Sequence, residues 1–298
     1  MEAHGPIERE NNQEATFVFS HNASDRSSQA QPGTGALIIN ADDWGFDQAT
    51  TDRILECATR RVISSASGMV FMEDSERAAD LARERGIDIG LHMNLTDAFS
   101  SPNVPTHLQE HHGRVARFLR RNRLSQIVYH PGLANSFAYA AKAQLEEFHR
   151  IYGHALQRID GHHHMHLSEN ILTAKLLPAG TLVRRNFSFA SGEKSWFNRR
   201  YRKFIDGRLQ QRHRMVDFLF SITPIQPERM ERILSYARQG VVELETHPVN
   251  ADEFHFLTSQ EMVTLLNGLP IAPNYSATAL QQTSGNTTFQ KVGAIFHE

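Results

Sequence analysis

With 298 residues, of which 40% are hydrophobic and 21% charged, the chain is long enough to bury a full core, as one α/β barrel or two smaller domains. The 31 Lys and Arg nearly balance the 33 Asp and Glu, so the overall charge gives no reason to expect a nucleic acid or an anionic membrane as partner. The single cysteine, Cys57, excludes an internal disulfide and suits a reducing compartment, so we expect a cytoplasmic protein.

The predicted elements begin after a polar N-terminal segment. Residues 1–35 contain only one hydrophobic cluster, 17–19, which is too short for a signal peptide or an integral membrane segment, so we expect a disordered leader. No repeat or linker divides the remainder. We therefore expect one domain over residues 36–275, followed by a polar tail over 276–298.

Apolar strands then alternate with amphipathic helices, which is typical of βα units around a mainly parallel sheet. In chain order, we predict strands at 36–40, 62–72, 87–95, 158–167, 182–186 and 241–247, and helices at 47–61, 74–85, 136–156, 227–239 and 259–266. Residues 96–133 and 187–220 are predicted to be loops, and long loops in compact domains often bind ligands.

Three short motifs stand at the ends of predicted strands, at residues 40–45, 90–92 and 160–166. Together they supply carboxylate and imidazole groups, the ligands that hold a water-activating divalent cation. Adjacent Asp42 and Asp43 would point to opposite sides of an extended chain, so one can bind a metal while the other handles a proton. Each motif alone has a structural alternative, because Asp43 can cap a helix and His92 can be a hydrogen-bonded core residue.

The histidine cluster favours the metal interpretation. If residues 158–167 form a strand, His162, His164 and His166 face one side and His163 the other. Several partly protonated rings are costly to bury unless something binds them. An Asp-His-His site is therefore the simplest interpretation, and the extra histidines can support the ligands or contact substrate.

Five segments carry a resemblance to a known family: ADDWG at 41–45, GLHMNLT at 90–96, DGHHHMHL at 160–167, ETHPV at 245–249 and the weaker FLTSQEM at 256–262. Through them the chain resembles the YdjC-like carbohydrate deacetylases over about residues 36–275. The resemblance implies a distorted TIM-like (β/α) barrel with fewer than eight complete units. It also implies removal of the acetyl group from an N-acetylated amino sugar or glycoconjugate, and it allows for a homodimer.

The resemblance also implies roles for individual residues. One divalent ion, Mg²⁺ or Zn²⁺, would be held by Asp43, His92 and His162. Asp42 would be the catalytic base and His247 the proton donor, with Arg184 orienting the base or the substrate. The residues expected to bind substrate or to support the ligands are Trp44, Asn94, His163, His164 and His166. Trp44 stands where the family usually has Phe, and Val249 stands where Gly is common. These two differences bear on the shape of the substrate that the site would accept more than on the reaction.

Other functions remain open at this point. A metal-independent glycosidase needs two carboxylates on either side of the bond, which adjacent Asp42 and Asp43 are unsuited to provide. A metal-dependent phosphohydrolase uses several carboxylates and histidines, often around two metals. A catalytically silent carbohydrate-binding protein is disfavoured because the proposed base and ligands are all present.

The two predicted loops contain the remaining features of interest. Trp196, Phe197 and Tyr201 offer faces for stacking on a sugar, with core packing as an equal alternative. Two basic runs, at 117–123 and 199–203, are expected to be solvated surface.

Overall fold

The computed structural model describes residues 35–153, 156–189 and 193–278. The predicted leader, apart from residue 35, and residues 279–298 of the predicted tail lie outside the described residues. Within the described ranges, no helix is both long and apolar enough to span a membrane.

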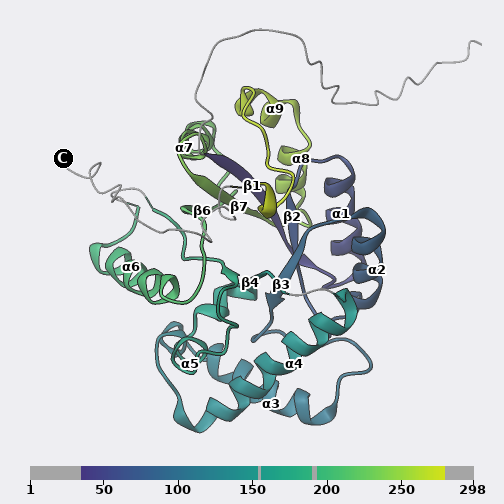
Figure 1. The fold of residues 1–298 in the computed structure, drawn as a ribbon, viewed down its shortest axis with the longest axis vertical. Coiled ribbons are helices and arrows are strands. Elements are labelled where there is room, and N and C mark those ends of the chain that lie inside the picture. Colours follow the sequence, from purple (N-terminus) through teal and green to yellow (C-terminus); the bar gives the residue numbers. More distant parts are fainter. Residues whose placement is uncertain (1–34, 154–155, 190–192, 279–298) are drawn as a thin grey trace, which may run out of the picture. The chain divides into compact units, whose positions relative to one another are not determined.

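Seven parallel strands form one curled sheet surrounded by helices (Figure 1). The strand order is β5-β4-β3-β2-β1-β7-β6. The bounds are β1 Ala36–Trp44, β2 Ser65–Gly68, β3 Ile89–Met93, β4 Arg158–Gly161, β5 Leu182–Val183, β6 Phe218–Ser221 and β7 Val241–Thr246. This single α/β domain fits a distorted TIM-like barrel with fewer than eight units, as predicted.

The two outer strands, β5 and β6, are connected by irregular backbone contacts instead of a further strand. Leu182 of β5 forms an isolated bridge with Arg214, and Val183 N donates to Arg214 O at 2.9 Å. On the other side, Ser188 N donates to Leu219 O of β6 at 2.8 Å. These hydrogen bonds link the two edges of the curled sheet.

Helices predicted from the sequence are found at α1 Gln48–Thr59, α2 Ser75–Arg85, α4 Ala134–Tyr152, α7 Pro227–Ala237 and α9 Gln260–Leu266. The two predicted loops were wrong in part. They contain the helices α3 Thr106–Leu119 and α6 Trp196–Gln210, and the second also contains β6. The short helices α5 Glu169–Thr173 and α8 Ala251–Leu257 were not predicted either.

The predicted strand over 158–167 is also wrong beyond Gly161. Residues 162–167 form a 3-10 turn, and His163 and His164 adopt left-handed backbone conformations with φ of 54° and 57°. The histidine side chains therefore do not alternate between two faces of a strand. His162 and His166 are buried, whereas His163 and His164 are more exposed.

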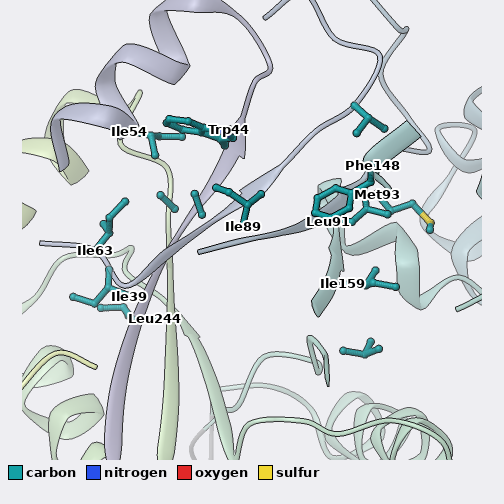
Figure 2. Close-up of a cluster of buried hydrophobic side chains, with 14 of the residues drawn as sticks. Ile39, Trp44, Ile54, Ile63, Ile89, Leu91, Met93, Phe148, Ile159 and Leu244 are labelled. Carbon is teal, nitrogen blue, oxygen red and sulfur yellow. The ribbon is translucent and has the colours of Figure 1, made fainter. Parts of the chain in front are cut away.

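Alternating residues of the strands divide the apolar core from a polar barrel interior. Ile39, Leu244, Leu91 and Ile159 all belong to one large buried hydrophobic cluster, in which Figure 2 shows Ile39 beside Leu244 and Leu91 beside Phe148. A smaller apolar cluster consists of Ile38, Leu182, Val216, Val241, Ala272 and Tyr275. Between the carboxyl ends of the strands, the interior positions carry charged groups instead.

Candidate metal centre and active site

The candidate site lies where the parallel strands end. Asp42 and Asp43 are at the end of β1, His92 is in β3, and His162 directly follows β4. Because the carboxyl ends of parallel strands meet at one rim of a barrel, distant segments can deliver side chains to a single site. The structure brings together the residues predicted from three separate motifs.

Asp43, His92 and His162 converge on one point. Oδ1 of Asp43 lies 3.2 Å from Nε2 of His92 and 2.9 Å from Nδ1 of His162. One ligand atom from each residue lies within 4.8 Å of the others, close enough for all three to contact a common ion. The backbone of Asp43 has φ 72°, a conformation that Asp adopts more readily than most residues.

The surroundings of His92 fit a metal ligand. Its Nδ1 hydrogen-bonds Oδ1 of Asp160 at 2.7 Å, an arrangement that fixes the ring and directs Nε2 toward Asp43. Nε2 is buried and, among the described residues, has no hydrogen-bond partner of good geometry. A buried imidazole nitrogen of this kind needs a partner, and a cation between it and Asp43 would supply one.

The charges of the site agree with this arrangement. Burial alone would raise the pKa of Asp43, but the adjacent imidazoles of His162 and His92 hold it well below its usual range. Burial would lower the pKa of His92, but the negative charge of Asp42 and the contacts with Asp160 and Asp43 raise it well above its usual value. The pocket therefore favours positive charge at the point where these side chains meet.

Arg184 organises the buried carboxylates next to the candidate metal ligands. Its two terminal nitrogens donate to both oxygens of Asp42, at 2.6 Å and 2.7 Å. The same guanidinium contacts Asp160 at 3.1 Å, Glu243 at 2.7 Å and Glu245 at 3.1 Å. These five side chains are all buried. The predicted base and the predicted orienting arginine are thus in direct contact.

His247 lies close to Asp42 and Glu245. One ligand atom each of Asp42, Glu245 and His247 lie within 4.8 Å of one another. The backbone N of His247 donates to Glu253 Oε2 at 2.6 Å, and Glu253 also accepts hydrogen bonds from Thr246 and Asn250. Buried Glu253 therefore fixes the turn that presents the His247 side chain.

The extra histidines occupy three different environments. His164 Nε2 lies 3.3 Å from Glu245 Oε2. Burial raises the pKa of Glu245, but the interactions with His164 and Arg184 lower it to about 2. His163 Nδ1 contacts the hydroxyl of Thr96 at 3.0 Å. His166 is buried and Nε2 hydrogen-bonds the carbonyl of Arg184 at 2.9 Å. Of these three, His163 is exposed, His164 is partly exposed and His166 is buried.

Trp44 and Asn94 have structural contacts. Trp44 is fully buried and its indole N donates to the carbonyl of Ala78 in α2 at 3.2 Å, which places it in the core. Asn94 is also buried. Its side-chain oxygen accepts from the backbone N of Thr96 and of Asp97, so it holds the loop that follows β3.

Several residues of the site were not predicted from the sequence: Asn40, Ser67, Asp97, Arg158, Asp160, Glu243 and Glu245. Glu243 and Glu245 alternate along β7, and charged residues at every second position of a buried strand indicate a polar barrel interior. Asp160 is the first residue of the motif at 160–166, but no role could be assigned to it from the sequence. Ser67 donates to Asp160 Oδ2 at 2.5 Å, a contact between strands that no spacing in the sequence reveals.

Comparison with known proteins agrees with the geometry. A chitooligosaccharide deacetylase from Serratia marcescens is 32% identical over 140 residues, which cover 45% of this chain and 52% of that protein. A carbohydrate deacetylase from Clostridium beijerinckii is 25% identical over 251 residues, which cover 78% of this chain and 94% of that protein. The chain thus spans about half the length of the first relative and nearly all of the second.

A solved structure shares the fold. The crystal structure of a proposed cellobiose-phosphate cleavage protein from Enterococcus faecalis V583 aligns with a TM-score of 0.59 at 21% identity, over 82% of this chain and 98% of that one. The family model described as YdjC-like protein matches residues 36–268, which include every motif at the strand ends. The chain therefore belongs to the YdjC-like protein family.

Proposed function

We propose that this protein is a metal-dependent hydrolase that removes the acetyl group from an N-acetylated amino sugar and releases acetate. The names of two relatives, a chitooligosaccharide deacetylase and a carbohydrate deacetylase, support the substrate class. The observation that carries the proposal is the convergence of Asp43, His92 and His162 directly beside the buried Asp42–Arg184 pair. A cation site next to a fixed carboxylate is the arrangement that amide hydrolysis requires.

The excess of carboxylates inside the barrel supports a cation site. The buried interior carries Asp42, Asp160, Glu243 and Glu245, and Arg158 and Arg184 are the two arginines among them. Asp43 adds a further carboxylate at the rim. Because an uncompensated buried charge is costly, a divalent cation would stabilise this arrangement.

When bound, the cation would lower the pKa of water and polarise the acetyl carbonyl. Two imidazoles and one carboxylate favour zinc by ligand softness, with magnesium as the alternative. We propose a single ion, held by Asp43, His92 and His162.

Asp42 is suited to take a proton from the attacking water. Its Oδ1 accepts hydrogen bonds from Asn40 and Arg184, whereas Oδ2 accepts one from Arg184 at 2.6 Å. A carboxylate oxygen has two lone pairs, so Oδ2 keeps one available for a proton. Arg184 holds the carboxylate in one orientation, which removes the need to reorganise it during the reaction.

His247 is the proposed proton donor to the departing amine. An amine leaves poorly unless it is protonated, and histidine can deliver a proton near neutral pH. The ring lies within reach of both Asp42 and Glu245, and Glu253 fixes its backbone. A proton taken up by Asp42 would therefore have only a short distance to travel to reach His247, the proposed donor to the amine.

The geometry weighs against the alternatives. A glycosidase needs carboxylates about 5 to 9.5 Å apart with the sugar between them, whereas Asp42 is held against Arg184 and Asp43 against two histidines. A second group, Asp97, His162 and His163, shares His162 with the proposed site. A phosphohydrolase with two metals would use both groups, so metal stoichiometry distinguishes the two functions.

The test is an acetate-release screen over N-acetylglucosamine, its oligomers and N-acetylated glycoconjugates, together with metal analysis of the same preparation. We expect one metal ion per chain, and acetate release that a chelator abolishes and added metal restores. Two bound ions, with phosphate release from phosphorylated sugars, would contradict the proposal.

Two variants assign the roles of the adjacent aspartates. Asp42→Asn is expected to keep its metal and lose turnover, because the amide cannot accept the proton. Asp43→Asn is expected to lose metal. If Asp42→Asn deacetylates as fast as the wild type, Asp42 is not the base.

We further propose that the protein works in the cytoplasm, in keeping with its single, buried cysteine, Cys57. A homodimer is the assembly that the family resemblance allows. Light scattering of the purified chain measures that state directly, and fractionation of cells tests the location.

A further inference from the structure

Large hydrophobic side chains are exposed mainly in two segments. In the described residues, eleven such side chains are exposed, and eight of them lie in residues 117–130 or in α6. The most exposed are Leu124 at 63%, Phe197 at 77% and Phe204 at 61%. We call residues 117–130 and α6 together the basic apolar face.

Positive charge is concentrated in the same two segments. They contain nine of the 31 Lys and Arg of the chain, and only one of its 33 Asp and Glu. The one acid, Asp206, is buried and bound to Arg185 at 2.9 Å. Among the described residues, Arg208 is the only one of the nine cations with an ion-pair partner. A chain with a net charge of −2 thus has a strongly cationic surface here.

The two segments belong to one side of the barrel, because both contact α5. From residues 117–130, the backbone N of His130 donates to Asn170 Oδ1 at 2.8 Å. From α6, Arg208 binds Glu169 at 2.8 Å. Figure 1 shows α5 and α6 on the same flank of the sheet.

The basic apolar face also borders the candidate active site. Gln126 donates to the carbonyl of His164 at 3.1 Å. The ring of His164 packs on Phe187 at 4.6 Å, and Arg202 of α6 lies over the ring of Phe189 at 5.1 Å. Both segments therefore connect to the rim of the site through direct side-chain contacts.

Helix α6 has the residue distribution of an interfacial helix. It buries Ile205, Asp206 and Leu209, and its outer face carries aromatic rings interleaved with cations. Arg200 lies 5.5 Å from the ring centre of Trp196. Aromatic rings at the level of lipid headgroups, flanked by Lys and Arg, are the pattern by which helices bind to a bilayer surface.

We propose that the basic apolar face binds the surface of an anionic lipid bilayer, with the mouth of the active site beside the membrane. The exposed aliphatic residues Leu124, Ile127 and Val128 gain from contact with lipid chains, and the cations gain from anionic headgroups. This binding is peripheral and needs no membrane-spanning segment. It goes beyond the proposed deacetylase activity and does not depend on it.

The charge pattern disfavours two other occupants. In a symmetric dimer through this face, each copy would place its nine cations against those of its partner. A nucleic acid would satisfy the cations and aromatic rings, but it offers no apolar environment for the three exposed aliphatic side chains. An anionic bilayer offers negative headgroups to the cations and lipid chains to the exposed apolar side chains.

The test is sedimentation of the full-length protein with vesicles of phosphatidylcholine alone or with about one third phosphatidylglycerol, without substrate. We expect binding to the anionic vesicles only, and its loss at high salt. Arg200→Glu/Lys203→Glu is expected to weaken binding at least about tenfold. Phe204→Ser and Leu124→Ser/Val128→Ser are expected to weaken it several-fold.

Matched control variants make the same kinds of substitution outside the basic apolar face. Arg85→Glu/Arg238→Glu carries the same change in charge, and Val263→Ser removes an exposed aliphatic residue from α9. Both are expected to bind like the wild type. The proposal is overturned if the wild type does not bind anionic vesicles, or if controls and face variants lose binding equally. It is also overturned if the face variants still bind anionic vesicles like the wild type and instead dissociate a dimer or lose binding to a single-stranded oligonucleotide.

Discussion

Arg184 binds both carboxylate oxygens of Asp42, at 2.6 Å and 2.7 Å, and both side chains are almost completely buried. The two residues are 142 positions apart in the sequence. A two-pronged contact of this kind fixes the plane of the carboxylate as well as its position. The orientation of the proposed base is therefore set by a single arginine that also contacts three other carboxylates.

Replacement of this arginine by lysine should reduce catalysis more than substrate affinity. In Arg184→Lys, the ammonium is a point charge that cannot hold both oxygens of Asp42. We expect kcat to fall by about tenfold or more, with little change in KM, and we expect metal content to stay at the wild-type level. Steady-state kinetics with metal analysis provide the check. A variant with unchanged kcat would show that the orientation of Asp42 does not limit the reaction.

Asp160 should control metal affinity without contacting the ion. Because it holds Nδ1 of His92 at 2.7 Å, Asp160→Asn leaves the ligand in place but weakens its orientation. Loss of such a supporting carboxylate typically lowers metal affinity about 10- to 100-fold. Competition with a chromogenic chelator measures this constant. Identical affinities in variant and wild type would argue against His92 as a ligand.

Gly90 should tolerate no side chain. A Cβ at this position would lie 2.7 Å from Cζ of Arg158, whose guanidinium is fixed by Asn40 and by the carbonyl of Ala66. We expect Gly90→Ala to lower the free energy of unfolding by about 1–3 kcal/mol. The matched control is Gly113→Ala in α3, where a Cβ meets no atom within 4 Å, and it should stabilise by about 0.5–1 kcal/mol. Urea unfolding compares the two. If the two substitutions change the free energy of unfolding equally, Arg158 can move aside to make room for the new Cβ.

His112 should make the protein less stable in acid. It is buried against Phe99, and burial lowers its pKa from 6.5 to about 4. Between these values the unfolded chain takes up a proton that the folded chain excludes, so this contribution to stability is present above pH 6.5 and is lost as the pH falls toward 4. Between pH 6.5 and pH 4, we expect the free energy of unfolding of His112→Phe to fall by about 3 kcal/mol less than that of the wild type. Urea unfolding of both proteins from pH 6.5 to pH 4 measures this difference. If the free energy of unfolding falls equally with pH in the two proteins, the prediction is wrong.

The convergence of the three candidate metal ligands could be predicted from the sequence because it depends on strand ends. Asp43, His92 and His162 each follow or end an apolar strand, and parallel topology alone brings such positions to one rim. The charged interior was less visible, since Glu243 and Glu245 join the site through contacts with Arg184 and His164, both far away in the chain.

The missed elements have identifiable physical causes. The apolar residues of helix α6, Phe197, Tyr201, Ile205 and Leu209, recur at helical spacing, but five cations lie among them, and the basic run at 199–203 was interpreted as solvated surface. The turn at His163 and His164 uses left-handed backbone conformations, which are uncommon for residues other than glycine. This turn produces no recognisable pattern in a single sequence.

The hydrogen bonds between β5, β6 and the irregular segments beside them have a consequence for behaviour at high concentration. An unpaired strand edge can recruit a strand from another molecule and start aggregation. Here Arg214 occupies the free side of β5, and Ser188 occupies that of β6. In the part of the chain that the structure describes, the incomplete barrel is thereby protected against intermolecular strand pairing, although no eighth strand closes it there.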